Sequence, residues 1–143
     1  MKKNEAIIKV CGIDLLRRVV IVCVGSMESV EKKFLDPKFF KNYTLSEEKV
    51  KGIWDHVKTE WNFANDKFDV PQGVTFAYNG DVFILMPEWD SRVFIHEAYH
   101  AAQAVLRAVN SSDEELGAFI ISYIFERVCW TKGSIRKMVE EDK

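Results

Sequence analysis

The feature that most constrains the fold is a predicted β-hairpin followed directly by an apolar helix. Residues 74–78 and 82–86 are rich in β-branched and aromatic side chains, and they flank Asn79-Gly80, the pair that best fits a two-residue type I′ turn. Residues 91–109 then have the pattern of a helix, for which Asp90 is a suitable N-cap. Because this segment is apolar on nearly every side, we expect its helix to pass through the interior of the protein.

Further elements are predicted before this unit. Residues 7–11 and 17–24 are rich in Val and Ile, which predicts two strands. Thr44 and Glu47 have the spacing of a capping box, and a helix is predicted from residue 44 to about residue 65. The apolar positions that fall on one face of this helix are Val50, Ile53, Trp54, Val57 and Trp61.

Two more helices are predicted after the hairpin unit. Asn110 is expected to end the helix over residues 91–109, and residues 112 to about 130 are expected to form another apolar helix. The polar residues 131–143 are expected to form a solvated helix that frays. No domain boundary is indicated, so we expect a single α+β domain over residues 1–143.

Composition excludes several classes of protein. The 143 residues are 48% hydrophobic, enough for one domain with a substantial core. Twenty Lys and Arg residues against 22 Asp and Glu residues give a net charge of −2, which argues against a nucleic-acid partner. No apolar run is long enough to span a bilayer, so no membrane partner is expected. We therefore expect a cytoplasmic protein.

The cysteines support the same location. Cys11, Cys23 and Cys129 are odd in number and include no CxxC pair. This pattern suggests neither a disulfide framework nor a thiolate zinc site. We expect the three thiols to be reduced and buried.

The helix over residues 91–109 contains the motif His96-Glu97-Ala98-Tyr99-His100. Histidines four residues apart leave a helix from the same face and can bind one metal ion, for which zinc is the natural choice. Glu97 is rotated by about 100° from His96, a position from which a carboxylate reaches water bound to the metal. The alternative is a pair of buried, hydrogen-bonded histidines, which would be costly in an apolar helix without a partner.

A catalytic zinc site has three protein ligands and one open position, so a third ligand must be found. The residues after His100 exclude an extended motif with a third histidine, and His56 has no recognisable ligand spacing. Glu114 and Glu115 are the better candidates. Their alternative role is helix capping, as Ser112 with Glu115 or Ser111 with Glu114 has capping-box spacing. The residues alone leave this choice open, since the glutamates follow the far end of the motif helix.

The motif helix, together with Asp113-Glu-Glu-Leu-Gly-Ala-Phe119, resembles the gluzincin branch of zinc metallopeptidases, especially compact forms from bacteriophages and mobile elements. This resemblance covers residues 44–130 and implies a zincin-like domain. Such a domain has a mainly antiparallel sheet, a backing helix, the HExxH helix and a following helix that bears a glutamate. The resemblance implies that Glu115 is the third zinc ligand, with Glu114 as the second choice. It departs from larger relatives at Phe119, where they have an aspartate near the metal.

The chemistry that follows is peptide hydrolysis of a protein or peptide substrate. Zinc lowers the pKa of its bound water and polarises the substrate carbonyl, while Glu97 accepts the proton and passes it to the leaving amine. Tyr123 is a candidate donor to the oxyanion, or else a core tyrosine whose hydroxyl is bonded. Residues 82–86 are a candidate edge strand for peptide binding, or else an ordinary core strand.

Two other classes of function remain compatible with the sequence. The protein could be a zinc-bound interaction module without catalysis that binds a host protein, or a metal-free helical module. Metal analysis distinguishes the metal-free module from the two zinc-bound hypotheses. A proteolysis assay with a Glu97 variant then distinguishes the metallopeptidase from the zinc-bound interaction module.

Overall fold

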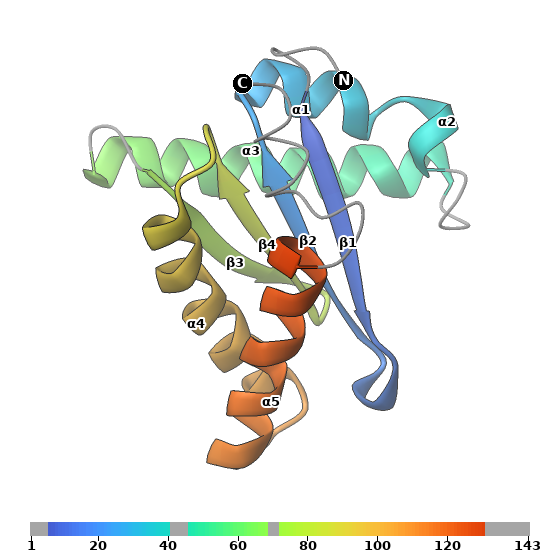
Figure 1. Ribbon diagram of the computed structural model, residues 1–143. Helices are drawn as coiled ribbons and strands as arrows, with labels where there is room; N and C mark the ends of the chain where they lie inside the picture. Colours follow the sequence, from blue (N-terminus) through green and yellow to red (C-terminus); the bar gives the residue numbers. More distant parts are fainter. Residues whose placement is uncertain (1–5, 41–45, 69–71, 131–143) are drawn as a thin grey trace.

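A four-stranded sheet lies between two layers of helices (Figure 1). The computed structural model describes residues 6–40, 46–68 and 72–130. The elements are β1 (Ile7–Ile13), a 3₁₀ turn (Asp14–Leu16), β2 (Arg18–Val24), α1 (Met27–Phe34), α2 (Pro37–Phe40), α3 (Glu47–Phe68), β3 (Val74–Tyr78), β4 (Asp81–Met86), α4 (Ser91–Ala108), α5 (Glu114–Phe125) and a π-helical turn (Glu126–Trp130). This arrangement confirms the α+β class, and all four predicted strands are present.

The sheet is mixed, with the strand order β1-β2-β4-β3. The pairings of β1 with β2 and of β3 with β4 are antiparallel, whereas β2 and β4 are parallel. The central strand β4 therefore has a neighbour on each side, and β3 forms an outer edge. Of the two roles predicted for residues 82–86, the ordinary core strand is confirmed and the free edge for a peptide is wrong, because those residues form this central strand.

The turn between β3 and β4 sets which side chains face each helical layer. Asn79 and Gly80 have φ angles of 53° and 86°, the positive values that a type I′ turn requires, so the predicted hairpin is confirmed. Side chains alternate along β3: Phe76 and Tyr78 pack on the side of α3, whereas Thr75 contacts α4. The edge strand thus contributes to both layers.

Two apolar cores lie on opposite faces of the sheet. One core packs α4 and α5 on β1, β2 and β4, and it includes Val22, Ile84, Phe94 and Ile120. The other packs α1, α2 and α3 on the opposite face, and it includes Val50, Trp54, Phe83 and Leu85. The predicted apolar face of α3 is confirmed by Val50, Trp54 and Val57, which are buried, while Ile53 and Trp61 are partly buried against the same core.

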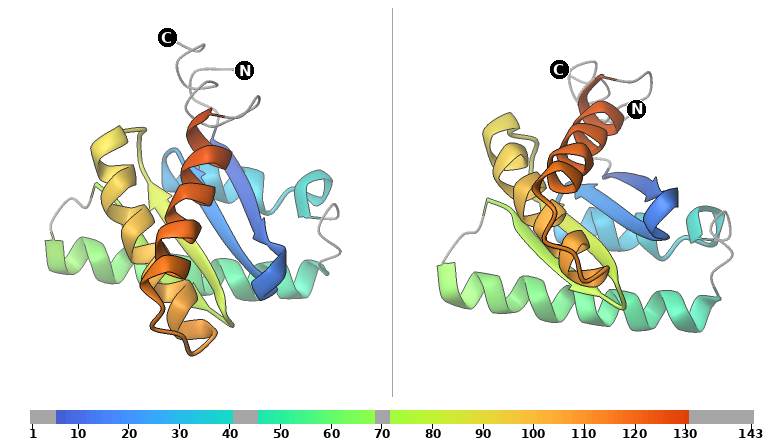
Figure 2. Two further views of the ribbon diagram at one scale, coloured as in Figure 1. Left: turned by 60° about the horizontal axis from the view of Figure 1, so that its bottom comes forward. Right: turned by 90° about the horizontal axis from the view of Figure 1, so that it is seen from below.

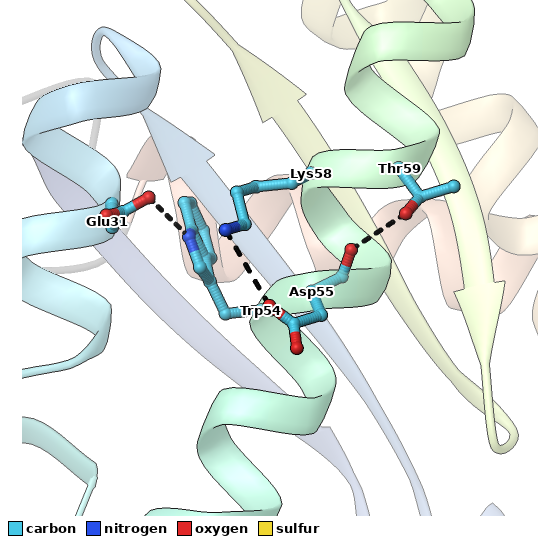
Figure 3. Close-up of polar contacts among 5 residues, drawn as sticks. All are labelled: Glu31, Trp54, Asp55, Lys58 and Thr59. Carbon is cyan, nitrogen blue, oxygen red and sulfur yellow. Dashed lines mark hydrogen bonds and ion pairs between the residues drawn. The ribbon is translucent and has the colours of Figure 1, made fainter.

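Helix α3 is joined to α1 by a hydrogen bond from a buried indole (Figure 3). Trp54 is 2% exposed, and its Nε1 donates to Oε2 of Glu31 over 2.6 Å. On the outer side of the same helix, Lys58 pairs with Asp55 at 3.6 Å. The indole bond satisfies a polar group that would otherwise be costly to bury, so it fixes the backing helix against α1.

The start of α3 differs from the prediction. Ser46 caps it, because the Ser46 Oγ accepts a hydrogen bond of 3.2 Å from the backbone N–H of Lys49. Glu47 is the first helical residue and not the third, so it does not close the predicted capping box. Thr44 and the predicted helix over residues 131–143 lie outside the described residues.

Helices α4 and α5 lie side by side on one face of the sheet, opposite α3 (Figure 2). A short connection joins them, so α5 runs back along α4. No helix in the described part of the chain is both long and apolar enough to cross a membrane.

All three cysteines are free and buried, as predicted. Burial raises the pKa of the Cys11 thiol to about 11, against the opposing charges of Arg127 and Lys9, and raises the pKa of Cys23 to about 12. In the unfolded chain these thiols ionise near their ordinary pKa of 9.0.

We predict that the native thiols react slowly with Ellman's reagent at pH 8 and that unfolding in guanidinium releases all three. Below pH 9 the thiols of Cys11 and Cys23 keep their protons in both the folded and the unfolded state, so they do not change the free energy of unfolding. As the pH rises from 9 to the folded-state pKa values of about 11 for Cys11 and about 12 for Cys23, stability falls by about 1.4 kcal/mol per pH unit for each of these two thiols. Rapid labelling of Cys23 in the folded protein would contradict this account.

Candidate metal centre

Helix α4 carries the HExxH motif and is fixed at both ends by local signals. The Asp90 carboxylate caps its start by accepting hydrogen bonds from the backbone N–H groups of Arg92 (2.9 Å) and Val93 (3.4 Å). Asn110, two residues after the last helical residue Ala108, has a φ of 57°, the left-handed conformation that often follows a helix. The predicted start and stop signals are both confirmed.

The exposure of α4 contradicts the prediction of an interior helix. Its inner face packs on the sheet and on α5, and the residues of this face include Phe94, Ala98, Ala101 and Val105. In contrast, Ile95 and Tyr99 are 54% and 55% exposed. The sheet lies beneath α4 and α5 lies on one side only, so the other surfaces of the helix remain open. The motif therefore lies on a surface helix.

His96 and His100 lie one turn apart, and their Nε2 atoms are 3.1 Å from each other. In a tetrahedral zinc site, two imidazole nitrogens that each lie about 2.05 Å from the ion are about 3.3 Å apart. Both side chains are exposed, and their ring planes cross at 80°. The pair therefore has the spacing of two ligands on one ion and is accessible from solvent.

Glu97 is the only charged side chain that is buried among the described residues, with an exposed fraction of 6%. Thr75 Oγ1 in β3 donates a hydrogen bond of 2.8 Å to Oε1 of Glu97. On the other side Gly73 approaches so closely that a Cβ there would lie 2.9 Å from Cγ of Glu97. A buried carboxylate is costly unless polar contacts hold it, so these two neighbours determine where it lies. Neither was identified from the sequence.

The three motif side chains line one open groove of about 1430 Å³. One wall is α4, and the other is formed by β3 and the turn that follows it. Of the described residues that line the groove, none belongs to α5. The edge of the sheet and the HExxH motif thus face the same space.

The structure does not bring Glu115 or Glu114 to the histidine pair. Among the described residues, no three side chains of His, Cys, Asp or Glu are grouped closely enough to hold a metal ion. The reason is the direction of the two helices. Gly117 lies beside Leu106, and Leu106 is six residues, or about 9 Å of helix, beyond His100. The first turn of α5 is therefore opposite the far end of α4.

The predicted capping boxes at this helix start are also wrong. Asp113 is the N-cap, and its Oδ1 accepts hydrogen bonds from the backbone N–H groups of Glu115 (2.9 Å) and Leu116 (3.3 Å). Glu114 and Glu115 are the first two helical residues, and both are exposed. Their negative charges lie at the positive end of the helix dipole and so stabilise α5.

Two other candidates lie away from the groove. The hydroxyl of Tyr123 donates a hydrogen bond of 2.8 Å to the backbone carbonyl of Gly12 in β1, so we assign it no catalytic role. It is the core tyrosine that the sequence offered as the alternative. His56, on α3, stacks on Tyr78 with ring centroids 4.5 Å apart, which places it on the opposite face of the sheet from α4. It is therefore not a third ligand in this arrangement.

Comparisons with protein-family models, with curated proteins and with solved structures found no match to this chain. Function is therefore inferred from the residues and their geometry.

The contacts of Glu97 lead to a paired test with two glycines. At Gly73 a Cβ would lie 2.7 Å from Cγ1 of Val93 and 2.9 Å from Cγ of Glu97, so Gly73→Ala should force both side chains to move. We expect a loss of about 1 to 3 kcal/mol in the free energy of unfolding, measured in urea.

Gly52→Ala is the matched control. Gly52 lies on the exposed side of α3, and a Cβ added there would have nothing within 4 Å, so this change should stabilise by about 0.5 to 1 kcal/mol. Equal effects at the two positions would mean that Gly73 is not packed against Glu97.

Proposed function

We propose that the protein is a zinc-dependent metallopeptidase that hydrolyses a peptide bond of a protein or peptide. One observation carries the proposal: two histidines with the spacing of zinc ligands and one buried carboxylate share the wall of an open groove. Imidazole nitrogen is a good ligand for zinc, and the exposed Nε2 atoms leave room for the remaining positions. When bound, zinc polarises a substrate carbonyl and lowers the pKa of a coordinated water.

Glu97 acts in this proposal as the general base and does not bind the ion. Its Oε1 accepts the hydrogen bond from Thr75, which orients the carboxylate and leaves Oε2 to take a proton from the attacking water. The same oxygen can then return the proton to the leaving amine. Thr75 is thus a positioning residue that links the base to the edge strand.

The substrate segment lies along β3 in an extended conformation. β3 is the outer strand of the sheet on the side of the groove, and its backbone can pair with a further strand. A peptide bound there passes between the edge strand and the histidines. This arrangement replaces the peptide-binding edge predicted at residues 82–86.

The order of elements supports the resemblance to gluzincins. A helix backs the sheet, a hairpin precedes the HExxH helix, and a helix that bears glutamates follows it. The zincin-like fold, including its compact phage-type form, remains part of this proposal. So does Glu115 as third ligand, which requires the first turn of α5 to move towards His100.

The second candidate function is a zinc-bound interaction module without catalysis. In the described part of the chain no third ligand lies beside the pair, which counts against a catalytic zinc site with its three protein ligands and leaves binding as the alternative. In that case the metal would fix the surface of α4, and the groove would bind a host protein without cleaving it.

Metal content and cleavage test the proposal together. Protein purified without chelator should hold about one zinc ion per chain, and His96→Ala should lose it. Glu97→Gln should keep the zinc and lower turnover of a cleaved substrate by at least about 10²-fold, because only proton transfer is removed. His56→Ala is the control and should retain both properties.

Each result separates the candidates. A wild-type protein that takes up no zinc in a titration overturns the metal centre. Zinc binding without cleavage of a broad peptide and protein library favours the interaction module. Normal cleavage by Glu97→Gln would exclude Glu97 as the base.

The third ligand is tested by comparing two neighbouring glutamates. Glu115→Ala should lower zinc affinity by about tenfold or more, whereas Glu114→Ala should leave it almost unchanged. The two positions have similar effects on the helix dipole, so stability is matched between them. Zinc affinity is measured by competition with a chromophoric chelator. If Glu115→Ala and Glu114→Ala bind zinc equally well, Glu115 is not a ligand.

A further inference from the structure

Beyond the histidines, the groove ends between two arginines from different elements. Arg107 lies in the last turn of α4, and Arg18 is the first residue of β2. Both line the groove beside the turn at Asn79-Gly80. The other end of the groove, about 22 Å away along α4, contains Arg92 together with Asp90.

Arg18 is held in place by the surrounding backbone. Its guanidinium donates hydrogen bonds to the carbonyls of Arg17 (3.1 Å) and Ala108 (3.3 Å). Its Nε is buried and has no hydrogen-bond partner among the described residues, and a Cβ at Gly80 would lie 3.1 Å from it. The side chain is therefore positioned by the hairpin turn and the end of α4.

The positive charge at this end is not neutralised by an ion pair. Neither Arg18 nor Arg107 forms a salt bridge with any described residue, whereas Arg92 at the opposite end lies 4.0 Å from Asp90. The positive charge of Arg18 also acts on the carboxyl group of Asp81, whose pKa it lowers against the larger effect of burial. Burial raises the pKa of Asp81, and its carboxylate is engaged by the backbone N–H of Val19 at 3.2 Å. The Arg18 and Arg107 end is thus a cationic pocket in a neutral to acidic protein.

We infer that this end of the groove binds an acidic side chain of an extended peptide lying along β3, an inference that rests on the proposed substrate-binding mode. Arg107 is seven residues from His100, or about 10.5 Å along the helix, and an extended chain advances about 3.3 Å per residue. The acidic residue therefore lies about three positions from the residue that is level with His100. Two guanidinium groups at one site are well suited to a carboxylate.

The test uses capped, dansylated peptides of β-branched residues that differ at one position. That position holds Glu, Gln or Lys, and binding to the full chain is measured by fluorescence anisotropy, both with zinc and after chelation. The Glu peptide should bind about five- to tenfold more tightly than the Gln peptide, and the Lys peptide more weakly than either. This preference should decrease at high salt.

Variants at the two ends of the groove give a matched comparison. Arg107→Ala should reduce the preference for Glu, and Arg107→Glu should abolish it, because its carboxylate offsets the remaining charge of Arg18. Arg92→Ala removes the same charge from the same helix at the opposite end and should leave the preference unchanged. If all three peptides bind equally, if none binds, or if Arg92→Ala has the same effect as Arg107→Ala, the inference is wrong.

Failure of the inference and failure of the proposed activity are distinguishable. Binding selectivity without any cleavage would leave the cationic pocket in place and remove the peptidase. Cleavage with no preference for Glu would support the peptidase and exclude the pocket for an acidic side chain.

Discussion

The structure depends on burial of the central strand β4 on both of its faces. Ile84 and Met86 are covered by the layer of α4 and α5, and Phe83 and Leu85 by the layer of α1 to α3. Each of these four side chains is at most 2% exposed. One short strand therefore belongs to both cores, and it holds β2 and β3 in register at its sides. The helix that carries the motif begins five residues after it ends.

Packing on the sheet explains how the surface helix α4 can hold the motif side chains in defined positions. Helix α4 is anchored by its inner face, and Glu97 is tied to the sheet edge through Thr75. The histidines extend from the free side of the same helix, within the same groove. The site thus combines one buried group, whose position is set by packing, with two exposed groups, whose spacing is set by the helical repeat.

Most elements could be predicted from the sequence because their signals are local. Asn79-Gly80 specifies its own turn, and Asp90 and Asn110 specify the limits of a helix. The spacing of His96 and His100 follows from the helix alone. Long-range relations could not be obtained in this way. The pairing that places β4 at the centre of the sheet, and the contact of Gly73 with Glu97, depend on residues that meet only after folding.

The hairpin of β3 and β4 also determines what an insertion or deletion in β3 would do to the structure. Successive side chains of β3 alternate between the two helical layers, and the type I′ turn sets its register against β4. A single-residue insertion or deletion within β3 would exchange the two faces and point Thr75 away from Glu97. It would also turn Phe76 out of the core that it shares with α3. The contact that positions Glu97 and the packing of the core would then be lost through the same change, although no chemically reactive side chain had been altered.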